Sequence, residues 1–397
     1  MNNKELLNEQ LIKAILDKNY KKVYYILALK ADVNARACEG IGCSALSVAK
    51  KIGATDIANL LEQRGGIEIN PSSEEADELG KKIFDFGADD KEEIKRLFFM
   101  GANLEVTNIL GDTLFVDAVR NSKYTVTNLL IELGADIHAK TREGRNALFY
   151  AVRYFNEDLF FDLLERGVSP HVVDKEGYNL LHEAIDCPIG GERLKTLINK
   201  GVNLEQGLKR DGTTPLVLAC LWENSYSALE LIKAGCDVNV RNTDNNKIPL
   251  NYVVYSSRMK IEVLEAMLER GADIDYEGYM GCSVLSHALH SGDKLESVNV
   301  WKKIALLIEY GANIKDSVQK LIDEKSKYYG KEEMIKEAFV KREERKIKEE
   351  QQRQIRIEQM QKKVGEMKRK EDAKVLKEVS EKKIKNSWWN KFFKIER

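Results

Sequence analysis

A short phrase built around glycine, an apolar residue and an acidic or amide residue returns along most of the chain. From Gly101 onward its starting positions lie 33, 33, 34, 34, 36 and 40 residues apart. A period of this length accommodates two short helices and a turn. The sequence therefore predicts a stack of helix pairs in which each pair contacts its neighbours. The phrase begins at Lys30, Arg64, Gly101, Gly134, Gly167, Gly201, Gly235, Gly271 and Gly311.

A second phrase follows the first after a short interval, as in GRNALFYA from Gly144 and GYNLLHEA from Gly177. Glycine suits the left-handed position that closes a helix, and Thr, Asn or Ser after the turn can cap the next helix. Apolar residues and a small alanine recur at the same places in each period. We expect those alanines to let the inner helices approach closely, namely Ala118, Ala151, Ala184, Ala219 and Ala288.

These two phrases resemble the ankyrin repeat, and the resemblance covers about residues 4–325. It implies an all-α fold, an ankyrin-repeat solenoid of helix-turn-helix units with hairpin loops, followed by a long charged C-terminal helix. We expect three parts: a solenoid of about nine units over 1–325, a charged helical segment over 326–385, and an aromatic, basic amphipathic terminus over 386–397. The unit at 66–101 lacks the second phrase, so we expect it to be degenerate.

Two late units are longer than the others because YSSRMK and SGDKLESVNVW are inserted between their helices. We expect loops on one edge of the stack, either tolerated surface insertions or recognition elements.

Composition favours a helical protein of the cytoplasm. Hydrophobic residues make up 43% and charged residues 32%, with only five prolines. The six cysteines show no framework spacing, and the first residues contain no apolar signal region, so a reduced, cytoplasmic setting is expected, while export to a host cell stays open. No run approaches the roughly 18 apolar residues of a membrane span. We therefore do not expect an integral membrane protein.

The sequence offers no motif for catalysis or cofactor binding, and we predict neither enzymatic activity, cofactor nor metal. P-loop, zinc-protease, nucleophile-elbow and CxxC patterns are all missing from the sequence. Cys282, His287 and His290 could in principle bind zinc, but they occupy repeat positions and no fourth ligand is near in sequence. His182 falls at the histidine of the second phrase, where the ankyrin resemblance implies a structural role. The rival hypothesis, an effector enzyme, would need its catalytic module in residues 316–397, which contain neither Cys nor His.

The resemblance implies a protein partner, of unknown identity, bound on the concave face formed by hairpin tips and the ends of the inner helices. Aromatic residues and arginine dominate the binding energy of protein interfaces. The candidate residues at those positions are Arg142, Arg145, Arg153, Tyr154, Tyr178, Arg210, Trp222, Tyr255 and Tyr279.

Residues 331–397 have a different character, with 22 Lys or Arg against 14 Asp or Glu. Strong helix formers and opposite charges four residues apart predict a long helix, which an interruption at Gly365 would divide. Ile357, Met360 and Val364 follow a coiled-coil spacing, but the pattern fails at Glu371, so we favour a single solvated helix in a monomer over a dimerising coil. The interspersed acids repel phosphate, so we do not expect nucleic-acid binding.

The terminus combines aromatic and basic residues on one expected helical face. The proposed tail anchor consists of Trp388, Trp389, Phe392 and Phe393. Such a segment can fill a groove on a partner, lie at a membrane surface, or fold back on the solenoid. The preferred function is a non-enzymatic adaptor, and the alternative is a membrane-surface or host-directed effector anchored by this WWNKFF segment.

Overall fold

The computed structural model describes residues 3–37, 41–85, 90–153, 157–185, 187, 191–244, 246–278, 282–290 and 292–392. The chain divides into two compact units, Met1–Tyr252 and Val253–Arg397. Within the described ranges the secondary structure is helical, with five isolated antiparallel β-bridges in place of strands. The expected all-α fold is confirmed.

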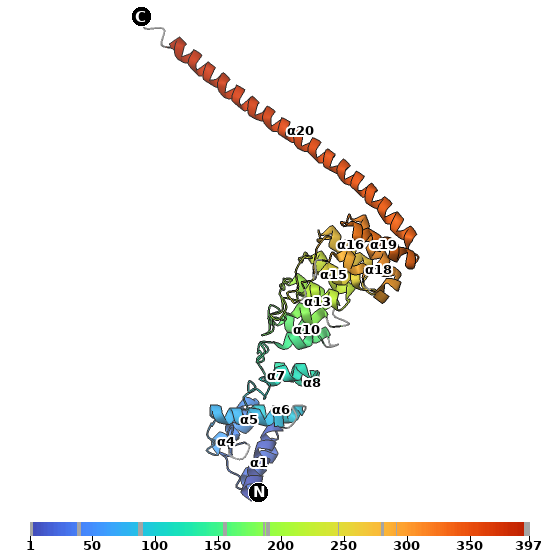
Figure 1. Ribbon diagram of the computed structural model, residues 1–397. Helices are drawn as coiled ribbons and strands as arrows, with labels where there is room; N and C mark the ends of the chain where they lie inside the picture. Colours follow the sequence, from blue (N-terminus) through green and yellow to red (C-terminus); the bar gives the residue numbers. More distant parts are fainter. Residues whose placement is uncertain are drawn as a thin grey trace. The chain divides into compact units, whose positions relative to one another are not determined.

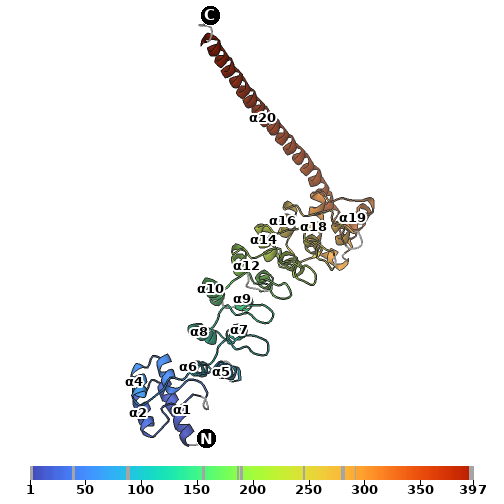
Figure 2. The same cartoon turned by 90° about the vertical axis from the view of Figure 1, so that its left-hand side faces the viewer.

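In the described part of the first unit, seven helix pairs precede α15. Figures 1 and 2 show their arrangement. Figure 2 shows hairpin loops projecting from the pairs that contain α7 and α9. The pairs are α1 (Asn3–Leu16) with α2 (Tyr20–Ala28), α3 (Ala45–Lys51) with α4 (Thr55–Gln63), α5 (Ser73–Asp85) with α6 (Lys91–Phe99), α7 (Leu114–Arg120) with α8 (Tyr124–Glu132), α9 (Ala147–Ala151) with α10 (Glu157–Glu165), α11 (Leu180–Ile185) with α12 (Gly191–Asn199), and α13 (Pro215–Leu221) with α14 (Ser225–Ala234).

Helix α15 (Pro249–Tyr255) leads from the first unit into the second. The second unit then contains α16 (Ile261–Glu269), α17 (Val284–Leu289), the 3-10 helix η2 (Gly292–Glu296), α18 (Val298–Glu309), α19 (Asp316–Tyr328) and α20 (Glu332–Phe392).

The predicted caps begin the inner helices. Thr113 accepts a hydrogen bond from the Val116 amide, and Ser44 and Ser283 do the same for the amides three residues later. The side chain therefore satisfies an amide that has no partner within the helix. At the end of a helix pair, Gly235 closes the outer helix α14 with a φ of 94°, a conformation that costs glycine little.

The core lies between successive pairs, as the repeated apolar positions predict. Leu148, Leu181 and Leu216 occupy equivalent places in three units and are at most 1% exposed. The five small alanines are likewise buried. Since α11 packs on α13 and α12 on α14, each helix pair covers the apolar face of the neighbouring pair.

The unit over 66–101 keeps both helices and a buried core. Leu79, Ile83, Ile94 and Leu97 are at most 2% exposed. A side chain at Gly80 would place its Cβ 2.2 Å from the Asn103 carbonyl oxygen, so α5 lies directly against the following extended segment. Around this repeat, α6 packs on α8 of the next pair.

The two insertions are packed into the second unit. In the first insertion, Met259 is fully buried, and the backbone carbonyls of Ser257 and Met259 accept hydrogen bonds from Asn299 of α18. In the second, η2 buries Leu295, whose carbonyl accepts a 2.7 Å hydrogen bond from the Trp301 indole. Ser257, Arg258 and Glu296 are exposed, so the insertions include surface segments, as expected, while Met259 and Leu295 anchor them in the core.

Helix α20 is continuous through Gly365, so the interruption that the sequence allowed does not occur. Its first turns pack on α18, burying Ile335 and Ala338 and placing the Arg345 guanidinium 3.5 Å from the centre of the Tyr310 ring. From Lys346 to Lys385 every described side chain is exposed. Figure 1 shows this portion leaving the helices of its own unit as a single extended rod.

Candidate partner-binding surface

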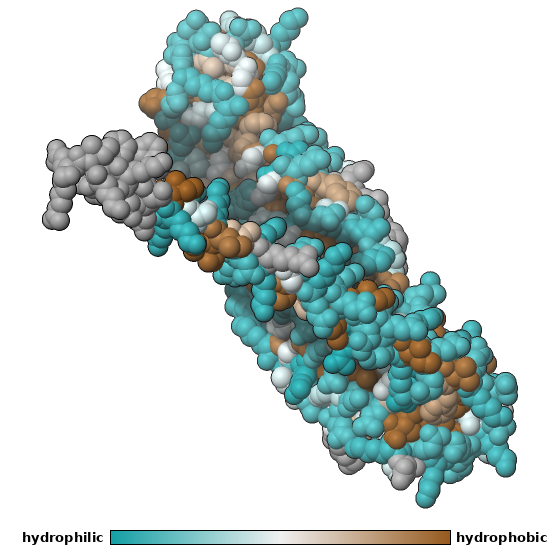
Figure 3. All heavy atoms as spheres, turned by 90° about the horizontal axis from the view of Figure 1, so that it is seen from above, coloured by the Kyte–Doolittle hydropathy of each residue, from teal (hydrophilic) through white to brown (hydrophobic). Residues whose placement is uncertain are grey.

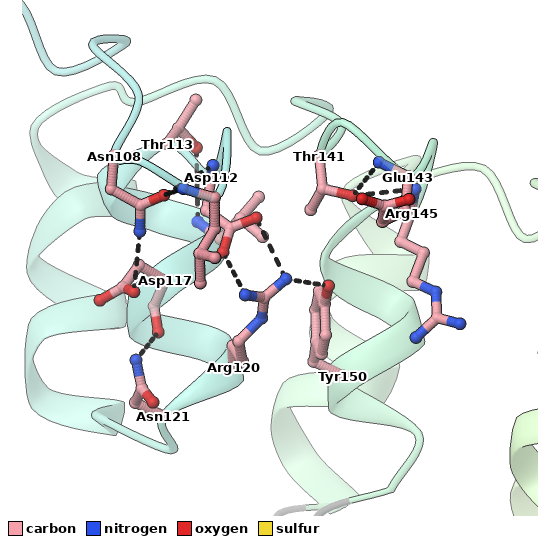
Figure 4. A network of polar contacts seen from close by, with 12 residues as sticks. Asn108, Asp112, Thr113, Asp117, Arg120, Asn121, Thr141, Glu143, Arg145 and Tyr150 are labelled. Carbon is pink, nitrogen blue, oxygen red and sulfur yellow. Dashed lines mark hydrogen bonds and ion pairs between the residues drawn. The ribbon is translucent and has the colours of Figure 1, made fainter. Parts of the chain in front are cut away.

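A hairpin tip between α6 and α7 presents two aliphatic side chains on an ordered turn. The Asn108 side-chain oxygen accepts hydrogen bonds from the amides of Leu110 (2.9 Å) and Asp112 (3.1 Å) (Figure 4). Ile109 is 89% exposed, and Leu110 is also exposed. Sequence reasoning missed this pair, although the apolar Ile-Leu before Gly111 departs from the Arg-Glu before Gly144 and the Lys-Glu before Gly177.

Arg120, at the end of α7, joins two successive units rather than facing solvent freely. Its Nη1 lies 2.5 Å from a carboxylate oxygen of buried Asp112, and its Nη2 donates a hydrogen bond to the Tyr150 hydroxyl at 2.5 Å (Figure 4). Burial raises the pKa of Asp112, and the charge of Arg120 opposes that change. This network aligns α7 with α9 and leaves Arg120 little freedom to bind a partner.

Arg145, a predicted binding residue, is already paired within the chain. Its Nε and Nη2 donate hydrogen bonds of 2.9 and 2.7 Å to Asp174, which lies in the next hairpin and is nearly inaccessible. Burial lowers the pKa of Arg145, but the hydrogen bond to Asp174 and the charges of Asp174 and Glu183 together outweigh burial, and the net pKa is raised. The guanidinium also lies 5.9 Å from the Tyr178 ring centre, so these two predicted residues do come together.

Other predicted arginines range from exposed to partly engaged. Arg153 is exposed and lies 3.2 Å from the buried Glu183 carboxylate, while Arg210 pairs at the same distance with Asp211. Arg142 is exposed, and its aliphatic stem covers Gly111 of the preceding tip. These side chains stabilise the edge of the stack and still present surface to a partner.

The predicted aromatic residues are distributed over both units. Trp222, at the C-cap of α13, is 45% exposed beside exposed Leu221. Tyr255 belongs to the second unit, where it is half-buried between the His287 ring and the Lys294 ammonium group. Tyr154 and Tyr279 lie outside the described residues, as do Phe393 and the side chains of Trp388, Trp389 and Phe392.

His182 links two neighbouring turns, as expected from its place in the repeat. Its Nδ1 accepts a hydrogen bond from the Asn179 amide at 3.2 Å, and its Nε2 lies 3.2 Å from the Thr213 carbonyl oxygen. Because a carbonyl can only accept, Nε2 carries the proton. Burial lowers the pKa of His182 to about 4, so the ring is neutral at physiological pH.

Among the described residues no group of three His, Cys, Asp or Glu side chains is placed to hold a metal ion. His287 stacks on Tyr255, and His290 Nδ1 lies 2.8 Å from the Ser286 carbonyl of its own helix. No helix in the described portion is long and apolar enough to cross a membrane.

Known proteins share the repeat. The family model for ankyrin repeats (3 copies) matches residues 152–242. Ankyrin repeat protein L371 of Acanthamoeba polyphaga mimivirus is 24% identical over 202 residues, which are 49% of this chain and 26% of the viral protein. Human neurogenic locus notch homolog protein 2 is 31% identical over 162 residues, 41% of this chain and 6% of the human protein.

The family model and the capped helix pairs together show that residues 152–242 form ankyrin repeats. Among solved structures, the ankyrin repeat domain of Bcl-3 gives a TM-score of 0.42 at 20% identity, covering 53% of this chain and 92% of that one. The human ASB11 ankyrin repeat domain gives the same TM-score and identity, covering 62% and 96%. The chain spans only a small part of the curated relatives it matches, 26% and 6% of their lengths.

Proposed function

We propose that this chain is a non-enzymatic adaptor that holds a protein partner on the concave face of its solenoid. Ankyrin repeats are generally protein-interaction modules, and no catalytic family is indicated for this chain. The contact residues are likewise proposed, and the partner is proposed only as a protein.

The observation that carries the proposal is the exposure of apolar side chains on ordered backbone at predicted contact positions. Trp222 and Leu221 are both nearly half exposed at the end of α13, where the Trp222 amide bonds back to the helix. Three of the four arginines of the predicted strip, in contrast, already pair with acids of the chain, namely Arg145, Arg153 and Arg210. We therefore expect Trp222, with the Ile109 and Leu110 tip, to supply most of the binding energy.

Quantitative mass spectrometry of proteins captured by the full chain and by Trp222→Ala tests this assignment. A hot-spot tryptophan contributes about 2 kcal/mol, so capture of the principal partner should fall roughly 30-fold. Lys233→Ala is the control, because Lys233 is an exposed residue of the neighbouring outer helix that pairs with Glu230. Equal capture by all three chains would move the interface elsewhere.

The aromatic terminus supports an alternative, a membrane-surface or host-directed effector. Helix α20 extends to Phe392, so the backbone of the first part of the aromatic terminus continues the helix. Comparing liposome co-sedimentation of the full chain with a chain ending at Lys385 tests the anchor. Equal pelleting of the two chains would eliminate it.

A further inference from the structure

The outer helix of the first pair exposes an aromatic face unlike that of other outer helices. In α2 the buried side is formed by Val23, Ile26 and Leu27. Tyr25 is 64% exposed, and the other three apolar residues of the opposite side are 44% to 50% exposed. We call these four residues, Tyr20, Tyr24, Tyr25 and Leu29, the α2 face.

Helical geometry spreads the α2 face over one half of the helix. Tyr20 and Tyr24 are four residues apart and share one edge, while Tyr25 and Leu29 share the other, with Lys21 between the two edges. The neighbouring outer helix α4 exposes Thr55, Asp56, Asn59, Glu62 and Gln63 instead. The exposed aromatics are therefore a property of α2 and not of the repeat.

Lysines outnumber carboxylates beside this face, which Asp17 and Asp32 flank in the sequence. Residues 18–31 contain four lysines and no carboxylate, and the Arg64 guanidinium lies 5.4 Å from the centre of the Tyr24 ring. Residues 1–64 carry 10 Lys or Arg against 7 Asp or Glu, whereas residues 65–330 carry 31 against 43. The repeats thus have a basic N-terminal end on an otherwise acidic body.

Lys30 stands where the other units use glycine. It adopts a φ of 66°, while Gly65, Gly101 and Gly134 fill the same position after their own outer helices. A side chain in this left-handed conformation costs about 1 kcal/mol relative to glycine. The chain therefore carries a backbone penalty at the position that places a fourth lysine beside the α2 face.

We propose that the α2 face binds the surface of an anionic membrane. Exposed tyrosine rings and a leucine on an outer helix, with exposed lysines nearby in the sequence, match an interface where rings lie at headgroup level and lysines contact anionic lipid. A protein partner with an acidic segment would share the charge complementarity. Such a partner would insert its own anchor residues into a pocket of this chain. Here, in contrast, the rings of this chain are themselves exposed. The inference is independent of the concave-face proposal.

Co-sedimentation of the full chain with phosphatidylcholine vesicles, with and without about 30% phosphatidylserine, tests the proposal. Each lysine near an anionic surface changes binding about five-fold, so Lys21→Gln/Lys22→Gln/Lys30→Gly should weaken binding to the anionic vesicles about 100-fold. Tyr25→Ser/Leu29→Ser should weaken it about ten-fold. Thermal melting checks that each variant is folded, and Lys30→Gly should, if anything, melt later.

A charge-matched control replaces three exposed lysines of other units, Lys175, Lys200 and Lys209, with glutamine. It should bind the anionic vesicles nearly as well as the wild type. The same ratios are expected in a chain ending at Lys385, which removes any contribution of the aromatic terminus. The proposal is overturned if the wild type does not bind these vesicles, or if the control loses as much binding as the α2 variants. It is also overturned if the α2 variants impair only the capture of an acidic protein.

Discussion

Acidification should weaken the stack at His182 before it affects most carboxylates. The folded pKa of His182 is about 4, below its ordinary value of 6.5, because the ring is buried. Between these values the unfolded chain binds the extra proton and the folded chain does not, so stability falls as the pH falls. The whole shift corresponds to about 3 kcal/mol, of which about 1.3 kcal/mol should be lost between pH 7.5 and pH 5.5.

The structure indicates why the folded state resists the proton. The ring is buried, and the loss of solvation of a charged ring outweighs the contact of Nδ1 with the Asn179 side-chain oxygen, which lies 2.8 Å away and would accept a hydrogen bond from an added proton. His182→Gln can keep a donor for Thr213 and an acceptor for Asn179, but it cannot titrate. Its stability at pH 7.5 should be lower than that of the wild type, and its further loss on acidification should be smaller by about 1.3 kcal/mol.

Urea denaturation of both chains at pH 7.5 and 5.5, followed by circular dichroism, measures this difference. Contributions from the other histidines and from the carboxylates are common to the two chains and cancel. Hydrogen exchange of peptides from α11 and α13 would show whether the loss is local, since repeat arrays need not unfold in one step. Equal losses in wild type and variant would refute the assignment of a buried neutral ring.

Two further substitutions test the packing. Gly177→Ala would bring Cβ to 2.8 Å from the Gly207 carbonyl oxygen at a φ of 94°, so it should lower the free energy of unfolding by about 2 to 3 kcal/mol. Gly134→Ala has open space around its Cβ and should cost only about 1 kcal/mol. Equal urea midpoints for the two variants would contradict this difference. Lys303→Met leaves two buried carbonyls without their ammonium donor and should cost about 2 kcal/mol, whereas its exposed neighbour Lys302→Met should be nearly neutral by the same assay.

The fold followed from the sequence because its determinants are local and periodic. A glycine such as Gly134, a cap such as Thr113 and an alanine such as Ala151 each act within a few residues or against an identical neighbour. Repetition then multiplies a weak local signal into a reliable one. The same reasoning predicted the role of His182, which depends on one residue of the next turn.

Tertiary structure decided which polar and apolar side chains are exposed and free to contact a partner. The sequence identified Arg145 as a binding residue, but only the stacked hairpins reveal its pairing with Asp174, 29 residues away. Periodicity likewise predicted edge loops at the insertions, where the structure packs Met259 and Leu295 against α18. Exposure depends on what the neighbouring units cover, and a pattern within one segment does not contain that information. The repeat therefore determined the architecture, while the packing of its irregular residues determined the surface.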